Sequence, residues 1–314
     1  MLGILVSATN YDDATARIAS AAGAGQPMAV TALAVKREAA LAWLGVYHAE
    51  RRLALLADLR RENQLLQYTL PARIAGGRSQ PADLTMARQE ALALDDRSDE
   101  LTRDLRRARA ELRRWVGVRA DDALVGPPML PAVVAEAVRG GLHRHAELLA
   151  YGPMRAMANA EMAEADAEKR GDWAWEVAYS RRPRYDDMVS FQISVDLPWQ
   201  RQRRQQPAVE AKRQEALRID AEREETLRRH SAEVDAMLAD AAALEAQLTR
   251  LQGAGLALAD ERVRLATASY QAGRGDLGAV LAARAQAVDA RLRAIELEAQ
   301  RDAVHVRLTT LIAE

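Results

Sequence analysis

The side chains of this chain that could carry out chemistry do not gather into a catalytic motif. The sequence contains no Gly-x-Ser-x-Gly, no P-loop and no His-Glu-x-x-His pattern. These patterns would indicate a nucleophilic serine, a phosphate-binding loop and a zinc protease. We therefore predict that the protein is not an enzyme and that it has no catalytic residue and no cofactor.

Two groups of side chains could in principle bind a metal ion. His143 and His145 are two residues apart, a spacing that does not place them on one helical face. Met154, Met157 and Met162 could bind a soft metal, but methionine at helical spacing is typical of packing. The alternative roles for the histidines are solvation and helix capping. We therefore predict no metal site.

Alternating apolar and polar side chains between Asp172 and Trp199 predict a β-hairpin that could span a bilayer or line a pore. The first arm carries Trp175, Val177 and Tyr179 on one face, and residues 181–187 make the loop. The second arm has an apolar face of Val189, Phe191, Ile193 and Val195. Its polar face carries Ser190, Gln192, Ser194 and Asp196.

An apolar face opposite a polar one is typical of a barrel strand between lipid and water. Each arm has about ten residues, and roughly 9–11 tilted residues cross a bilayer as a strand. We expect the apolar face of the second arm to contact lipid and the polar face to line a lumen. The alternative is an amphipathic hairpin packed on a soluble helical core.

Composition excludes several other classes of protein. A net charge of −1 gives no strong positive potential that would attract nucleic acid. The absence of cysteine excludes disulfides and thiolate metal sites. One phenylalanine and 4% aromatic residues are too few for a conventional globular core of this size. The abundance of Ala, Leu, Arg and Glu favours long helices, and no apolar run reaches the length of a membrane-spanning helix.

Heptad repeats predict antiparallel coiled-coil helices on both sides of the hairpin. We expect breaks near Leu70-Pro71 and at residues 76–81, a capping role for Gly117, and a linker over 118–130. The expected helices cover residues 28–70, 82–116, 131–139, 145–170, 207–252, 256–271 and 276–312.

The glycines of Gly253-Ala254-Gly255 predict a turn where two of these helices reverse. We expect Gly253 and Gly255 to form the tip of the helical bundle. Nearby acidic residues could form carboxylate rings, which favour cations at a constriction. These residues are Asp240, Glu245, Asp260 and Glu261. The alternative is an ordinary solvated helix face.

The two halves of the chain show a weak internal repeat. Residues 75–84 align without a gap on residues 272–281, an offset of 197. The offset makes Leu56-Ala57-Asp58 the first-repeat partner of the expected tip. It also places the first copy of the hairpin before Met1, so we expect this chain to lack that hairpin.

Several segments together resemble the TolC-type outer-membrane efflux channels. Tyr270, Gly273, Asp276 and Leu281 resemble the family motif between coiled-coil and equatorial helices. The other matching segments are Ser190–Trp199, His145–Leu148 with Ala146 in place of the family proline, and Val35–Arg52. The last of these is similar to the heavy-metal branch of CzcC/CusC-like channels. The resemblance covers residues 28–312.

The resemblance implies a mainly α fold in which long antiparallel coiled-coil helices are joined to one β-hairpin. The hairpin would contribute to a trimeric outer-membrane β-barrel. The expected partners are two further copies of this chain, a periplasmic adaptor, an inner-membrane RND-type pump and outer-membrane lipid, but no nucleic acid. Most of the chain would lie in the periplasm. We expect export of heavy-metal cations; the alternatives are a drug-efflux channel and a soluble periplasmic scaffold without a pore.

On this interpretation the chain has five parts. They are an atypical N-terminal segment (1–27), first-repeat periplasmic helices (28–117), a linker with equatorial helices (118–171), the outer-membrane hairpin (172–199), and the second-repeat coiled coil with its equatorial helix (200–314).

Overall fold

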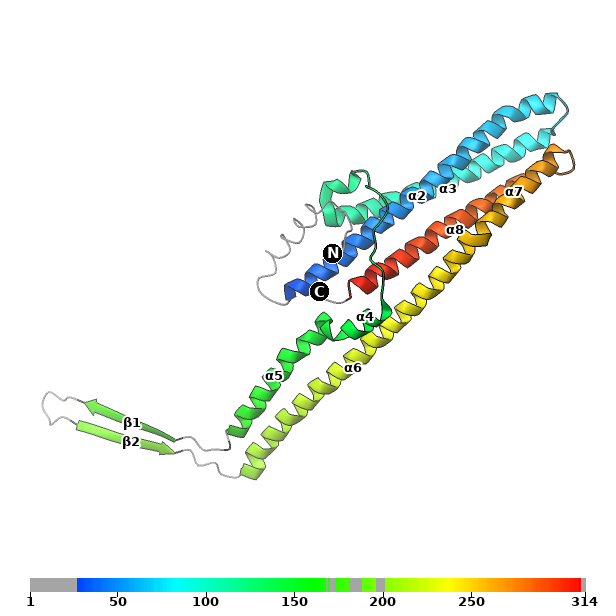
Figure 1. Ribbon diagram of the computed structural model, residues 1–314. Coiled ribbons are helices and arrows are strands. Elements are labelled where there is room, and N and C mark those ends of the chain that lie inside the picture. The colour runs from blue at the N-terminus through cyan, green and yellow to red at the C-terminus, as the bar shows by residue number, and fades with distance from the viewer. Residues whose placement is uncertain (1–26, 168, 170–172, 181–187, 196–200, 312–314) are drawn as a thin grey trace. The chain divides into compact units, whose positions relative to one another are not determined.

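The computed structural model describes residues 27–167, 169, 173–180, 188–195 and 201–311. They form long helices and one β-hairpin (Figure 1). The chain divides into two compact units, Met1–Gly140 with Glu233–Glu314, and Gly141–Ala232. Within the described ranges, no helix is both long enough and apolar enough to cross a membrane. Most of the segment predicted as atypical, residues 1–26, lies outside the described residues.

The first unit contains an antiparallel helix hairpin of α2 (Pro27–Ala75) and α3 (Pro81–Val116). Trp43, Leu44 and Leu112 are buried in one core cluster, and Leu105 and Trp115 are partly buried against it. The break expected near Leu70-Pro71 is wrong, because α2 continues to Ala75. Leu70 is fully buried against Ala87 and Leu277. That packing favours a continuous helix, even though Pro71 has no backbone N–H to donate to the carbonyl four residues earlier.

The turn between α2 and α3 and the turn between α7 (Leu256–Gln271) and α8 (Leu277–Thr309) are the same Schellman-type motif. Gly77 and Gly273 both have φ of 68°. The equivalent N–H to C=O bonds are Gly77 to Ile74 and Arg78 to Arg73, then Gly273 to Tyr270 and Arg274 to Ser269. Gly273 therefore matches Gly77, an offset of 196, and the predicted offset of 197 is one residue too long.

The chain does not reverse at Gly253-Ala254-Gly255. Helix α6 (Arg201–Arg250) passes through a π-helical segment, Leu251–Gly255, into α7, and Gly255 keeps right-handed dihedrals of −61° and −46°. The predicted turn is therefore wrong, and its supposed partner at 56–58 also lies inside a helix. Leu248 and Leu251 pack with Leu297 of α8, which favours unbroken helical geometry through the glycines.

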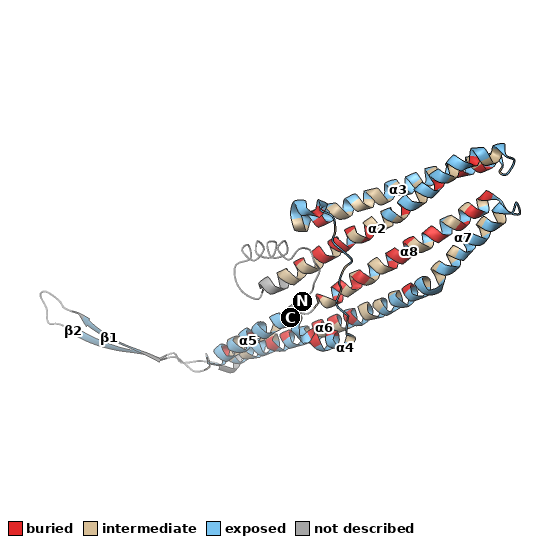
Figure 2. Cartoon of the chain, turned by 45° about the horizontal axis from the view of Figure 1, so that its top comes forward, coloured by how far each residue is buried: buried red, intermediate tan, exposed pale blue. Residues whose placement is uncertain are grey.

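Helix α8 is buried along much of its length (Figure 2). Its apolar face packs against α2 and α7 in the first unit. Asp276 begins the helix, since its carboxylate accepts the backbone N–H of Ala279 at 2.7 Å. The heptad residues Val288 and Ile295 are buried, as the sequence pattern predicts.

Short elements connect the long helices. Gly117, with φ of 67°, ends α3 as predicted, and a 3₁₀ helix follows at Gly117–Asp121. Helix α4 (Ala135–Gly141) begins four residues later than the predicted start at Pro131. A 3₁₀ helix at Leu142–Arg144 then leads to His145.

In the second unit, α5 (Ala146–Ala167) lies beside the first part of α6 (Figure 1). Ala158 of α5 packs with Ala216 and Ile219 of α6. The Tyr151 hydroxyl lies 3.1 Å from the Thr226 hydroxyl, which adds a polar contact between the same two helices. The sequence pattern therefore predicted α5 correctly to within a few residues.

The hairpin pairs β1 (Trp173–Ser180) with β2 (Met188–Val195) in antiparallel register. The loop over 181–187 lies outside the described residues. The residue pairs are Trp173–Val195, Ala174–Ser194, Trp175–Ile193, Glu176–Gln192, Val177–Phe191, Ala178–Ser190, Tyr179–Val189 and Ser180–Met188. The register therefore places the two apolar faces predicted from the sequence on the same side of the sheet.

Candidate functional site

The hairpin presents an exposed apolar face. Trp175 lies opposite Ile193, and Val177 lies opposite Phe191. The rings of Trp175 and Phe191 are stacked with centroids 6.5 Å apart. Yet Phe191 is 63% exposed and Val189 67% exposed. A continuous apolar face left open to solvent indicates a surface that is covered by another molecule or by lipid.

The opposite face of the hairpin is polar. Glu176 is paired with Gln192, and Ala178 with Ser190, whose hydroxyl donates to the Ala178 carbonyl at 3.3 Å. Ser194 lies on this face as predicted, whereas Asp196 lies outside the described residues. Two strands alone leave their outer edges unpaired, and an isolated two-stranded hairpin is at best marginally stable in water.

The four family-motif residues meet at the α7–α8 turn. Gly273 adopts the left-handed backbone of the turn and Asp276 caps α8. Leu281 packs beside the cluster of buried residues at this end of the first unit. Tyr270 joins the two turns, because its hydroxyl donates to Asp83 at 3.0 Å. The motif therefore builds a chain reversal, where the resemblance implied a break between coiled-coil and equatorial helices.

The acidic residues predicted around the tip lie along helices, away from any chain reversal. Asp240 is on α6, whereas Asp260 and Glu261 are on α7. Asp260 accepts a hydrogen bond from Arg291 of α8 at 2.6 Å, and Glu245 pairs with Arg301 at 3.5 Å. Their contacts join neighbouring helices. The exposed residues at the true turns include Arg78 and Arg274, which occupy equivalent positions.

A polar pocket of about 840 Å³ in the first unit lies beside a buried hydrogen bond between His48 and Asp302. Its lining includes Tyr47, Arg51, Glu298, Arg301, Asp302 and His305. His48 Nε2 is 3.0 Å from Asp302 Oδ2, and both residues are buried. Burial alone would raise the pKa of Asp302, but hydrogen bonds from His48 and Arg301 and the Arg301 charge lower it overall.

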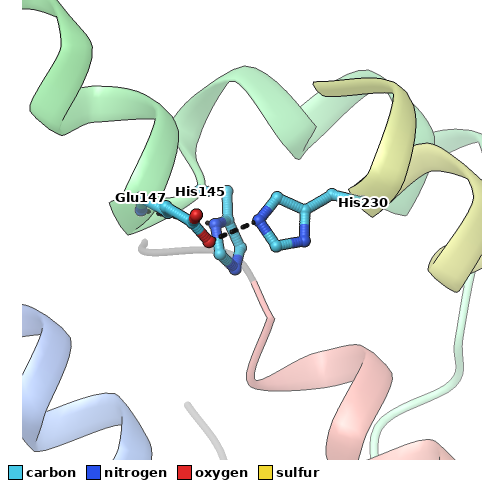
Figure 3. Close-up of side chains that lie close together, drawn as sticks. All are labelled: His145, Glu147 and His230. Atoms are coloured by element: carbon cyan, nitrogen blue, oxygen red, sulfur yellow. Dashed lines mark hydrogen bonds and ion pairs between the residues drawn. The ribbon is translucent and has the colours of Figure 1, made fainter. Parts of the chain in front are cut away.

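A second polar cluster lies in the other unit. His145 precedes α5, Glu147 lies in its first turn, and His230 comes from α6 (Figure 3). The His145 and His230 rings are 4.0 Å apart between centroids. Sequence spacing did not predict this cluster, because the histidine nearest to His145 in the chain is His143, which is exposed and is not among these three residues.

Glu147 is the centre of this second cluster. Its Oε2 lies 2.9 Å from Nε2 of His230, and its Oε1 accepts from Arg229 at 2.6 Å. Partial burial would raise the pKa of Glu147, but the bonds from His230 and Arg229 outweigh it and lower the pKa. The carboxylate is thus ionised and acts as an acceptor at neutral pH.

The comparisons with known proteins bear on the fold. No family model and no curated protein matches this chain. A membrane protein from Pseudomonas aeruginosa is 20% identical, with a TM-score of 0.77 over 96% of this chain and 70% of its own. CusC, which forms a transmembrane channel, is 17% identical, with a TM-score of 0.76 over 98% of this chain and 74% of its own. The outer-membrane channel OprN is 16% identical, with a TM-score of 0.72 over 96% of this chain and 70% of its own.

The chain has the TolC-like channel fold. The predicted fold class, long helices with a single strand pair, is confirmed. CusC and OprN are channels rather than enzymes, in agreement with the lack of a catalytic motif. These likenesses do not separate a heavy-metal branch from a drug-efflux branch.

Proposed function

We propose that this protein is the outer-membrane channel component of a tripartite efflux system. The observation that supports this most is the hairpin, whose paired apolar residues share one exposed face within a TolC-like fold. Val189, Phe191, Ile193 and Val195 face lipid. Ser190, Gln192, Ser194 and Asp196 face the lumen. Eight extended residues are about 27 Å long at 3.4 Å each, and at a barrel tilt of about 40° they rise about 21 Å, against an apolar band about 25 Å tall in such barrels.

The working assembly is a homotrimer in the outer membrane, with most of the chain in the periplasm. A strand pair inside a membrane must join a closed barrel, because each unpaired backbone group in lipid costs several kcal/mol. Symmetric association of identical hairpins pairs these edges. The polar face then surrounds a water-filled path for the exported solute.

The helix turns are the docking surface for the periplasmic adaptor, which links the channel to an RND-type inner-membrane pump. The turns at 76–80 and 272–276 are the ends of the two helix hairpins in the first unit. Arg78 and Arg274 are exposed there at matching positions. Cross-linkable residues at 78 and 274 should therefore capture the adaptor, while one at 253, inside the π segment, should not.

The exported solute is a heavy-metal cation. The similarity of residues 35–52 to the heavy-metal branch supports this choice, and an organic drug is the competing substrate class. Deletion of the gene in the source cell should lower the inhibitory concentrations of metal salts and leave those of organic antibiotics unchanged. The reverse result would favour the drug-efflux alternative.

Fractionation of the source cell tests the channel assignment. Antibody detection should find the native protein in the outer-membrane fraction, as a trimer that requires detergent for extraction. Protein that stays in the supernatant after membranes are pelleted without detergent would instead support the soluble scaffold.

A further inference from the structure

Three metal-binding side chains converge in the second unit from separate parts of the chain. One ligand atom from each of His145, Glu147 and His230 lies within 4.8 Å of the other two. Figure 3 shows the carboxylate of Glu147 beside the two imidazole rings, with a dashed line from its oxygen to His230. Zinc bonds to imidazole nitrogen and carboxylate oxygen are about 2.0–2.2 Å long, so two ligand atoms of one ion lie at most about 4.4 Å apart.

We propose that His145, Glu147 and His230 bind one divalent transition-metal ion of the zinc class. Two imidazole nitrogens with one carboxylate oxygen are a donor set that suits Zn²⁺, whereas Mg²⁺ and Ca²⁺ prefer oxygen ligands alone. Three protein ligands leave at least one coordination position for water or another ligand. This site is separate from the proposed channel lining, and the inference does not depend on transport.

The surrounding contacts hold the ligands in place. The backbone N–H of His145 donates to the Leu142 carbonyl at 2.8 Å, which fixes the residue at the entrance to α5. One helical turn beyond Glu147 and His230, the Tyr151 and Thr226 hydroxyls lie 3.1 Å apart. Such contacts between α5 and α6 position the carboxylate and the imidazole before an ion arrives, which favours binding.

The charges also allow an ion to enter. Arg229 holds Oε1 of Glu147, so Oε2 is the oxygen directed at His230. A metal ion would take the position between Oε2 and Nε2 of His230, and the neutral imidazole would then carry its proton on Nδ1. Glu147 is 47% exposed in its side chain, which provides a path from solvent.

Without a metal, the same residues would act only as a polar contact between α5 and α6. Zinc titration separates the two roles. The full chain, purified in detergent and stripped with a chelator, is titrated calorimetrically with Zn²⁺ in excess Mg²⁺. We expect one Zn²⁺ ion to bind per chain. When Co²⁺ replaces Zn²⁺, the visible absorption spectrum should show the d–d bands of a cobalt ion bound by nitrogen ligands.

Three variants complete the test. His230→Ala and Glu147→Gln should each weaken zinc binding at least about 10-fold, the loss that even an indirect partner of a metal ligand causes. His143→Ala, a nearby exposed histidine, should leave binding unchanged. Glu147→Gln keeps the size of the side chain, and circular dichroism confirms its fold. The proposal is wrong if wild-type protein binds no stoichiometric Zn²⁺, or if His143→Ala weakens binding as much as His230→Ala.

Discussion

The hydroxyl of Tyr270 donates to Oδ2 of Asp83 at 3.0 Å and ties together two turns that lie far apart in the sequence. The same hydroxyl lies 2.8 Å from the Ser79 hydroxyl, and Arg73 stacks 4.9 Å above the Tyr270 ring. Asp83 also accepts the backbone N–H of Gln80 at 2.9 Å, at the start of α3. One tyrosine therefore connects the α7–α8 turn to the start of α3.

Replacing Tyr270 with phenylalanine should destabilise this end of the first unit. A hydrogen bond to a charged group contributes about 1.5–3 kcal/mol to the free energy of unfolding. Because Tyr270 is half-buried, we expect a loss at the lower end, seen as a lower midpoint in denaturant titration. Tyr68→Phe, at a residue 84% exposed, is the control and should not change the midpoint. Equal midpoints for Tyr270→Phe and wild type would contradict the assigned role.

A pair of glycine variants tests where the chain reverses. Gly273→Ala should destabilise by about 1–2 kcal/mol, because φ of 68° is unfavourable for a residue with a Cβ atom. Gly253→Ala should stabilise by about 0.5–1 kcal/mol, since Gly253 is helical and nothing lies within 4 Å of an added Cβ. Thermal unfolding of both variants measures whether each substitution raises or lowers the melting temperature. A stabilising Gly273→Ala together with a destabilising Gly253→Ala would instead support a turn at Gly253-Ala254-Gly255.

Asp302 should make stability depend on pH. Its pKa is lowered in the folded state, so the folded protein binds fewer protons than the unfolded chain near the ordinary value of 3.8. The stabilisation is complete above that value and is lost as the pH falls through the folded pKa. Asp302→Asn should therefore lower the melting temperature at pH 7, and this difference should shrink below about pH 3.8. The exposed Asp96→Asn should show neither effect, and a constant difference at all pH values would contradict the linkage.

The two faces of β2 should differ in their tolerance of charge. Ile193→Asp places a carboxylate on the apolar face, where charge near the bilayer midplane costs up to about 2–4 kcal/mol, less for Asp than for Arg. We expect it to reduce the amount of assembled protein in the outer membrane. Ser194→Asp, one residue along on the polar face, should assemble normally. An equal loss of assembled protein from membrane fractions of both variants would contradict the assignment of Ile193 to lipid and Ser194 to the lumen.

The sequence predicted the hairpin best. Alternation fixed which residues share a face, because a shift of one residue would move every side chain to the other side. The pairing of Val177 with Phe191 and of Tyr179 with Val189 therefore follows from the pattern. Burial could not be predicted in the same way, since it depends on what covers the face.

The helix boundaries were harder to predict where packing overrides local signals. Gly253 and Gly255 suggest a turn, but two glycines in a helix cost only about 2 kcal/mol against alanine. The contacts of Leu248 and Leu251 with Leu297 of α8 offset that cost. The true reversal at Gly273 has the same residue type, and its φ of 68° and its hydrogen bonds distinguish it in the structure.

The cluster of His145, Glu147 and His230 could not be predicted from local sequence patterns. Glu147 and His230 are 83 residues apart, and no spacing rule joins them. They meet because α5 and α6 pack through Ala158, Ala216 and Ile219. The nearby His143 gave a stronger local signal but is not part of the cluster.

Spin-label accessibility along β2 is the measurement that tests the membrane role of the hairpin most directly. The chain has no cysteine, so single cysteines at positions 189–194 can be labelled cleanly in native outer-membrane vesicles. Collisions with oxygen, which partitions into lipid, should peak at 189, 191 and 193. Collisions with a water-soluble nickel chelate should peak at 190, 192 and 194. Flat accessibility with both reagents, without this two-residue period, would contradict a hairpin placed between lipid and lumen.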